Sequence, residues 1–338
     1  MRSRVHPTRE TPMIRSTLWL ASAFMFTFAC GDDESPATDA PSAQSIAAVA
    51  QDTPELSTLV AAVQFASEGD DLLNLISNPG TLTVFAPTNA AFDALAVELT
   101  GNASAKGADL LTAGNKPLLR SVLQYHVLTS EVFAADIPFG RAITTAEGAI
   151  FKIESGTPPT IVDGRNRTSS IAQVDIDASN GVVHVIDKVI LPPDKNIVET
   201  AQALASGSPA EFTILVDAVV AANLATTLSG PGPFTVFAPT DAAFAALLTE
   251  LNVSKQELLA DTALLTKVLT YHVIPNRVLA ADITAGAPVT TVETGTFSIN
   301  AQNHITDERQ RTAQIVSTDT FASNGVIHVI DKVILPAP

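Results

Sequence analysis

Histidines and tyrosines are the first candidates for chemistry in this chain of 338 residues, because they recur as pairs. The dipeptide Tyr125–His126 returns as Tyr271–His272, and these are the only two tyrosines. One further histidine accompanies each pair at a repeated position, His184 or His328, whereas a zinc site needs three or four ligands. We therefore expect no metal and no cofactor. The favoured interpretation is core histidines with satisfied hydrogen bonds, and the two Tyr-His pairs stay candidates for contact with a partner.

Patterns typical of enzymes are missing from the sequence. There is no Gly-x-Ser-x-Gly elbow, no phosphate-binding loop and no dinucleotide fingerprint. Serine, histidine and aspartate occur, but at no spacing that identifies a nucleophile and its base. The prediction is that the chain is not an enzyme, with a hydrolase as the weakest of three hypotheses.

Cys30 is the only cysteine, so neither an intramolecular disulfide nor a cysteine-rich zinc site is possible. It follows Arg15 and an apolar run, 18–29, that is shorter than the roughly 20 residues needed to cross a bilayer. Residues 1–29 are therefore predicted to be a signal peptide, with translation starting at Met1 or at Met13.

The segment Thr27–Gly31 resembles the lipobox of bacterial lipoproteins, although Thr27 stands where leucine is usual. The resemblance implies acylation of Cys30 and a membrane anchor. The alternative is an ordinary secretory signal with an incidental cysteine. Residues 30–43 lack large apolar side chains and are predicted to be a flexible tether that ends in the lipid anchor.

Composition narrows the possible partners. Hydrophobic residues make up 46% of the chain and charged residues 16%, which favours folded cores over disorder. Lys and Arg number 19 against 35 Asp and Glu, a net charge of -16. Such a surface repels phosphate backbones, so we expect no nucleic-acid partner.

The chain repeats itself beyond residue 44. Three segments of the first half return in order in the second half: 83–88 as 235–240, 125–127 as 271–273, and 178–192 as 322–336. A spacing near 150 residues is too long for a solenoid repeat. We therefore predict two homologous domains, 44–192 and 193–338.

Each half is predicted to place helices before strands. In the first half, apolar residues recur at helical spacing over 56–63, 92–99 and 118–123, and a strand over 81–85 ends in Ala-Pro. Thr88–Asn89 and Thr240–Asp241 are predicted helix N-caps. Asn-Gly pairs at 180 and 324 signal hairpins before the last strand. This order predicts an α+β fold with a mainly antiparallel sheet.

The three repeated segments, Thr-Val-Phe-Ala-Pro-Thr, Tyr-His-Val and Asn-Gly-Val-(Val/Ile)-His-Val-Ile-Asp-Lys-Val-Ile-Leu-Pro, resemble those of the fasciclin domain family. The resemblance covers nearly all of the chain past residue 44. It implies two tandem fasciclin-like domains, each a β-wedge or sandwich with helices packed at its N-terminal half. It also implies a non-enzymatic, extracytoplasmic module for cell adhesion and extracellular-matrix binding.

The first functional hypothesis is thus an adhesion or interaction module, exported and lipid-anchored to the periplasmic or outer face of the cell envelope. Its partner would be an envelope or matrix protein or a glycan, and two linked domains would raise avidity. The alternative is a carrier of an apolar small molecule such as a pigment or lipid, held by the Phe-rich helical faces.

Overall fold

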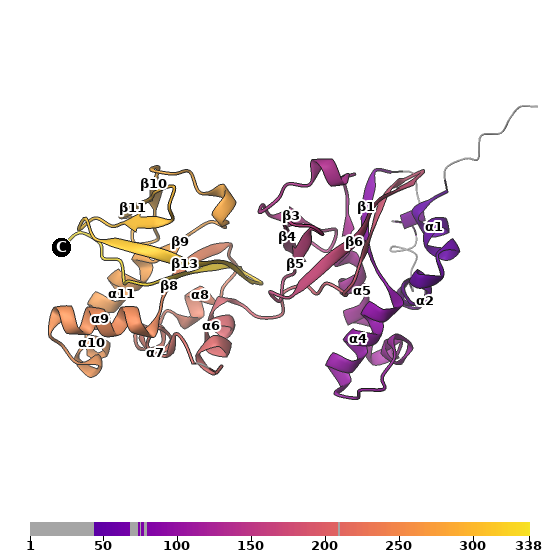
Figure 1. Ribbon diagram of the computed structural model, residues 1–338. Coiled ribbons are helices and arrows are strands. Elements are labelled where there is room, and N and C mark those ends of the chain that lie inside the picture. Colours follow the sequence, from indigo (N-terminus) through magenta and orange to yellow (C-terminus); the bar gives the residue numbers. More distant parts are fainter. Residues whose placement is uncertain (1–43, 68–73, 75, 78–79, 209) are drawn as a thin grey trace, which may run out of the picture. The chain divides into compact units, whose positions relative to one another are not determined.

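The computed structural model describes residues 44–67, 74, 76–77, 80–208 and 210–338. Cys30, the predicted signal peptide and the predicted tether lie outside these residues. All described residues belong to one compact unit, Ser42–Pro338. Within this unit, the helices of each half lie against the sheet of the same half (Figure 1).

The first half begins with helices and ends with strands. Its α-helices are α1 (Ile46–Asp52), α2 (Ser57–Ala66), α4 (Asn89–Thr100) and α5 (Lys116–Tyr125). Its strands are β1 (Leu82–Pro87), β2 (Val127–Leu128), β3 (Ile143–Thr144), β4 (Ile150–Glu154), β5 (Thr160–Val162), β6 (Thr168–Ala178) and β7 (Gly181–Ile186). Short 3-10 helices are η1 (Pro54–Leu56), η2 (Gly107–Leu110), η3 (Ala113–Asn115) and η4 (Ala134–Asp136).

The second half repeats this plan. Its α-helices are α6 (Ile197–Ala205), α7 (Thr213–Ala221), α8 (Ala225–Leu228), α9 (Asp241–Leu251), α10 (Lys255–Ala260) and α11 (Thr262–Tyr271), with the 3-10 helix η5 (Ala280–Asp282). Its strands are β8 (Phe234–Pro239), β9 (Val273–Ile274), β10 (Pro288–Thr290), β11 (Thr296–Ile299), β12 (His304–Thr306), β13 (Thr312–Ala322) and β14 (Gly325–Ile330).

The two sheets have the same topology. The strand order is β2-β1-β7-β6-β5-β4-β3 in the first half and β9-β8-β14-β13-β12-β11-β10 in the second. All neighbouring strands are antiparallel except β1 with β7 and β8 with β14, which are parallel. The predicted α+β fold with a mainly antiparallel sheet is confirmed. A parallel pair needs a long connection, and the chain between the first and the last strand of each half provides one.

Strand β1 runs two residues further than the predicted end at Phe85. Pro87 still pairs with Ile186 of β7, although proline has no N–H to donate. The next donor is the N–H of Thr88, which reaches the carbonyl of Ile186 at 3.2 Å. The proline is therefore the last residue of the strand and does not lie beyond its end.

The pairs Thr88–Asn89 and Thr240–Asp241 each cap two helices. Thr88 caps α4, because its side chain accepts the N–H of Ala91, and Thr240 caps α9 in the same way. The residue after each threonine caps an earlier helix of the same half. Asn89 accepts the N–H of Thr58 at the start of α2, and Asp241 accepts the N–H of Ile214 at the start of α7, both at 2.8 Å.

Two hydrophobic clusters fill each half. One lies between the helices and the sheet, and the other lies on the opposite side of the first strand around Phe85 or Phe237. The predicted apolar faces are buried at Phe92, Leu95 and Leu119. Leu99 and Leu118 depart from the prediction, because they are 45% and 38% exposed. Both lie at the rim of a cavity of about 60 Å³, which they border without entering the core.

Candidate functional site

The side chain of Tyr125 joins two loops through its hydroxyl group. The ring is fully buried at the end of α5 and packs edge-on against Phe151, with centroids 5.9 Å apart. The hydroxyl donates to the carbonyl of Ile150 at 2.6 Å and accepts the N–H of Gly164 at 2.8 Å. Burial raises the pKa of this hydroxyl well above its usual value, so Tyr125 stays neutral.

His126 is held as one neutral tautomer. Its Nδ1 lies 2.6 Å from the carbonyl of Val122 and must donate, while Nε2 accepts the N–H of Ile190 at 3.1 Å. The ring is 1% exposed, and burial lowers the pKa to about 4. An imidazole with both nitrogens engaged and no access to water is a structural crosslink, not a general base.

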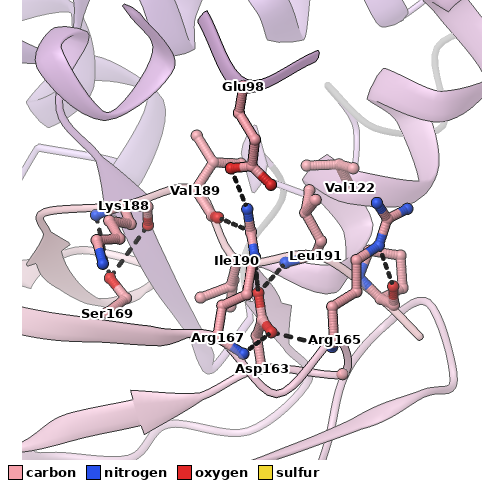
Figure 2. Close-up of polar contacts among 12 residues, drawn as sticks. Glu98, Val122, Asp163, Arg165, Arg167, Ser169, Lys188, Val189, Ile190 and Leu191 are labelled. Atoms are coloured by element: carbon pink, nitrogen blue, oxygen red, sulfur yellow. Dashed lines mark hydrogen bonds and ion pairs between the residues drawn. The ribbon is translucent and has the colours of Figure 1, made fainter. Parts of the chain in front are cut away.

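Asp163 completes this arrangement from the turn between β5 and β6 (Figure 2). Its carboxylate is 1% exposed and accepts three backbone N–H groups, those of Arg165, Arg167 and Leu191, each at 2.9 Å. The guanidinium of Arg167 adds two bonds to Oδ2, from Nε and one Nη, both at 3.0 Å. A buried carboxylate is stable only with such full pairing.

Arg167 also connects Asp163 to the chain after β7 and to α4. One Nη donates to the carbonyl of Val189 and the other pairs with Glu98 of α4 at 2.8 Å, as Figure 2 shows. We call Tyr125, His126, Asp163 and Arg167 the polar hub. The hub fastens the chain that follows β7, residues 187–192, to α5 and to the β5–β6 turn.

The second half contains an equivalent of most of this hub. Tyr271 donates to the carbonyl of Thr296, and His272 bonds to Val268 and Ile334 as His126 does to Val122 and Ile190. Asp307 accepts the N–H groups of its own turn and of Leu335, at 2.8–3.0 Å. The copies differ at the arginine. Arg311 pairs with Glu250 at 2.8 Å, but its buried Nη1 has no hydrogen-bond partner among the described residues.

The four residues predicted to contact a partner therefore all lie inside the protein. Tyr125, His126, Tyr271 and His272 are at most 2% exposed. Their placement favours the structural interpretation over direct recognition, because a partner could reach these rings only after the core opened. His184 and His328 are also buried, each between a carbonyl and a backbone N–H.

Sequence reasoning missed the acidic and basic members of the hub. The signal was present, because Asp163-x-Arg165-x-Arg167 returns as Asp307-x-Arg309-x-Arg311 at the same spacing as the last repeated segment. Neither motif carries a residue pattern typical of catalysis, so only comparison of the two halves could have found it.

The two halves also contact each other. Lys152 of β4, whose side chain is 8% exposed, pairs with Asp319 of β13 at 2.9 Å, and the Asp319 side chain is 3% exposed. Asn166 exchanges two hydrogen bonds with the backbone of Phe321, at 2.6 and 3.1 Å. Apolar contacts surround these bonds, from Ile150, Val162, Leu279, Phe321 and Val326. We call this set the junction.

Lys152 is charged in the junction. Burial alone would lower its pKa, but hydrogen bonds to the carboxylates of Glu154 and Asp319 outweigh burial and raise it. Asp319 is held in turn by the N–H of Ala280 at 2.8 Å. The pair is thus buried, charged and hydrogen-bonded on both sides, which is the condition under which a buried ion pair is favourable.

Among the residues that the structure describes, no helix is long and apolar enough to span a membrane. In the same residues, no group of three or more His, Cys, Asp or Glu side chains is placed to hold a metal ion.

The model of the Fasciclin domain matches residues 54–192 and 210–336 of this chain. Transforming growth factor-beta-induced protein ig-h3 of Oryctolagus cuniculus is 30% identical over 262 residues, which is 77% of this chain and 35% of the rabbit protein. The chain therefore spans about a third of that relative. Protein sll1483 of Synechocystis is 41% identical over 158 residues, 46% of this chain and 77% of the relative.

Among solved structures, the chain is similar to a FAS1 domain pair from the insect cell adhesion molecule fasciclin I. The TM-score is 0.39 and the sequence identity 17%, over 83% of this chain and 97% of the insect pair.

Proposed function

Because this chain belongs to the fasciclin domain family, we propose that it is a non-enzymatic adhesion or interaction module of the cell envelope. The observation that carries the proposal is the presence of two copies of the family domain in one chain, at 54–192 and 210–336. Domains of this family are known for adhesion and extracellular interaction. Two linked modules bind a repetitive partner more tightly than one does, because the second contact is intramolecular.

Export and anchoring belong to the same proposal. The apolar segment before Cys30 and the lipobox-like residues around it support acylation of that cysteine and attachment to the envelope. Each buried CH₂ of an acyl chain adds about 0.8 kcal/mol to membrane binding, so more than one chain gives stable attachment. The partner we propose is an envelope or matrix protein or a glycan, because a net charge of -16 disfavours polyanions.

The carrier hypothesis has no comparable support. The most apolar cavity of the first half lies between α1, α2 and β1, and its equivalent in the second half lies between α6, α7 and β8. Their volumes are about 60 and 30 Å³. A pocket for a lipid or pigment needs roughly 300–1,000 Å³. We therefore propose no apolar ligand for these cavities.

The test is an adhesion assay on the cells that export this chain. Cells with the intact gene are compared with cells whose product lacks residues 44–338, and with a Cys30→Ser variant. We expect adhesion to matrix-coated surfaces, or co-purification of an envelope component, to fall at least several-fold without the domains. The Cys30→Ser product should appear in the medium. Equal adhesion with and without the domains would overturn the proposal, and retention of Cys30→Ser in the membrane would overturn its anchoring part.

A further inference from the structure

A polar cavity of about 300 Å³ lies at the junction and is lined by both halves of the chain. Its walls are Glu147 to Ile150 and Pro192 from the first half, Pro193 at the boundary, and Arg277 and residues 321–323 from the second half. It is about five times larger than the apolar cavity near α1, and its volume lies at the lower end of small-molecule sites. It is therefore large enough for one small organic molecule.

Arg277 is the charged residue of this cavity for which no hydrogen bond or ion pair is found in the described part of the chain. Its side chain is half-buried, its Nε is fully buried without a hydrogen bond, and no ion pair to it is found among the described residues. Burial lowers the pKa of the guanidinium, which reflects the cost of holding an unpaired cation away from water. Nearly every other buried charge described above is paired. The unpaired guanidinium of Arg277 therefore favours the binding of an anion.

The other half of the cavity offers groups of a different kind. Glu147 lines it from the first half, and each of its carboxylate oxygens accepts one hydrogen bond, from Ser121 or from the N–H of Ala149. Each oxygen keeps a second lone pair for a donor. The hydroxyl of Ser323 also lines the cavity, and no hydrogen bond to it is found in the described part of the chain.

From these groups we propose that the junction cavity binds a small organic carboxylate that also carries hydrogen-bond donors, such as a sugar acid or an amino acid. Arg277 binds the carboxylate, in the planar geometry that guanidinium and carboxylate share. Glu147 and Ser323 accept the hydroxyl or ammonium donors of the ligand. The faces of Pro192 and Pro193 form an apolar wall beside it.

Charge favours a carboxylate over a phosphate. Because the carboxylate of Glu147 already lines the cavity beside one guanidinium, a dianion would add more uncompensated negative charge than a monoanion or a zwitterion does. The site is also special to the second half: the position equivalent to Arg277 in the first half is Glu131. The cavity therefore does not follow from the repeated fold, and it is independent of the adhesion proposed above.

The test is calorimetric titration of the chain purified from the cells that export it. The probes are D-glucuronate and L-alanine. The controls are D-glucose, which lacks the carboxylate, and acetate, which lacks the hydrogen-bond donors. We expect saturable binding of one or both probes and at least tenfold weaker binding of both controls. Binding of glucuronate alone identifies a sugar acid, and binding of alanine alone identifies an amino acid.

Variants assign the binding to the cavity. Arg277→Gln should weaken binding at least tenfold and Arg277→Lys should restore part of it, because lysine keeps the charge but not the fork. Lys188→Gln is the matched control, because it removes one positive charge from an exposed side chain outside the cavity. The proposal is overturned if neither probe binds, or if Arg277→Gln binds as the unsubstituted chain does while its circular dichroism and unfolding midpoint are unchanged. The proposal is also overturned if no probe binds and the losses in unfolding free energy caused by Arg277→Gln and Glu147→Gln are not additive in the double variant. That result would show that the two charges pair with each other.

Discussion

At the residue scale, the repeated Tyr-His pairs are explained by the bonds that they make inside the protein. Tyr125 and His126 each connect two backbone segments that are distant in the sequence, and both side chains are shielded from water. A buried polar group that loses its partner costs more than the bond itself contributes, so such residues tolerate little change. Their recurrence in both halves reflects this structural demand.

Removing one hydroxyl should test this account. Tyr125→Phe leaves the carbonyl of Ile150 and the N–H of Gly164 without their partner in a buried site, and we expect a loss of about 1–3 kcal/mol in unfolding free energy. Tyr271→Phe should cost less, because its N–H partner belongs to exposed Glu308, where water can substitute. Urea unfolding followed by circular dichroism measures both. An equal or reversed order would contradict the burial argument.

The same histidines should make the protein sensitive to mild acid. Burial lowers the pKa of His126 and His272 from 6.5 to about 4, so the native state binds fewer protons than the unfolded state between these values. Their contribution to stability is complete above pH 6.5 and falls as the pH drops towards 4. Between pH 7.5 and pH 5 we expect a loss of about 2 kcal/mol per histidine in unfolding free energy.

Urea unfolding at several pH values checks this dependence. The variant His126→Gln should be less stable at pH 7.5 but should show a shallower decline, because one of the buried histidines with a lowered pKa is gone. If its unfolding free energy declined between pH 7.5 and pH 5 as much as that of the unsubstituted chain, the assignment of this pH dependence to His126 would be wrong.

At the element scale, local signals in the sequence predicted the longer helices around the sheet, the first strand and the last hairpin of each half. The N-cap threonines, the apolar helical faces and the hairpin before the last strand all lie where expected, because each depends on neighbouring residues only. The exposed Leu99 and Leu118 were not predictable, because the apolar pattern of a helix shows which face is buried but not how far the packed surface extends. The role of Asp163 was hidden for a similar reason, since it depends on a chain segment 28 residues away.

Capping across elements yields a testable difference between the halves. Asp241 accepts the N–H and the hydroxyl of Thr213 and the N–H of Ile214, at 2.7–3.1 Å. Asn89 accepts the N–H of Thr58, donates to the carbonyl of Pro54 and bonds to the hydroxyl of Ser57, and all its bonds are between neutral groups. Bonds to a charged acceptor contribute about 1.5–3 kcal/mol and neutral ones about 0.5–1.5. Asp241→Ala should therefore lower the unfolding free energy more than Asn89→Ala does. Hydrogen exchange of the first turns of α7 and α2 would locate each effect, and equal losses would refute the comparison.

At the scale of the whole molecule, the polar hub belongs to the repeat, whereas the junction does not. The polar hub uses residues that are the same in both halves, so comparing the halves reveals it. The junction mixes repeated and unrepeated positions: Asp319 corresponds to Asp175, whereas Lys152 and Phe321 correspond to Ser298 and Asp177. Sequence repetition could therefore predict two domains but not how they contact each other, because the contact joins positions of the two halves that do not correspond to each other in the repeat.

The buried pair of Lys152 and Asp319 should hold the junction together. Lys152→Met leaves the Asp319 carboxylate buried with only the N–H of Ala280, and we expect a loss of about 3 kcal/mol. Asp319→Asn should cost less, because Lys152 keeps Glu154 at 2.6 Å. The double variant should cost less than the sum, which a double-mutant cycle in urea measures. Arg141→Met is the matched control: it breaks the exposed pair with Asp282 and should cost below about 1 kcal/mol. If Lys152→Met were as mild as Arg141→Met, the pair would be exposed to water in solution, and the two halves would move independently.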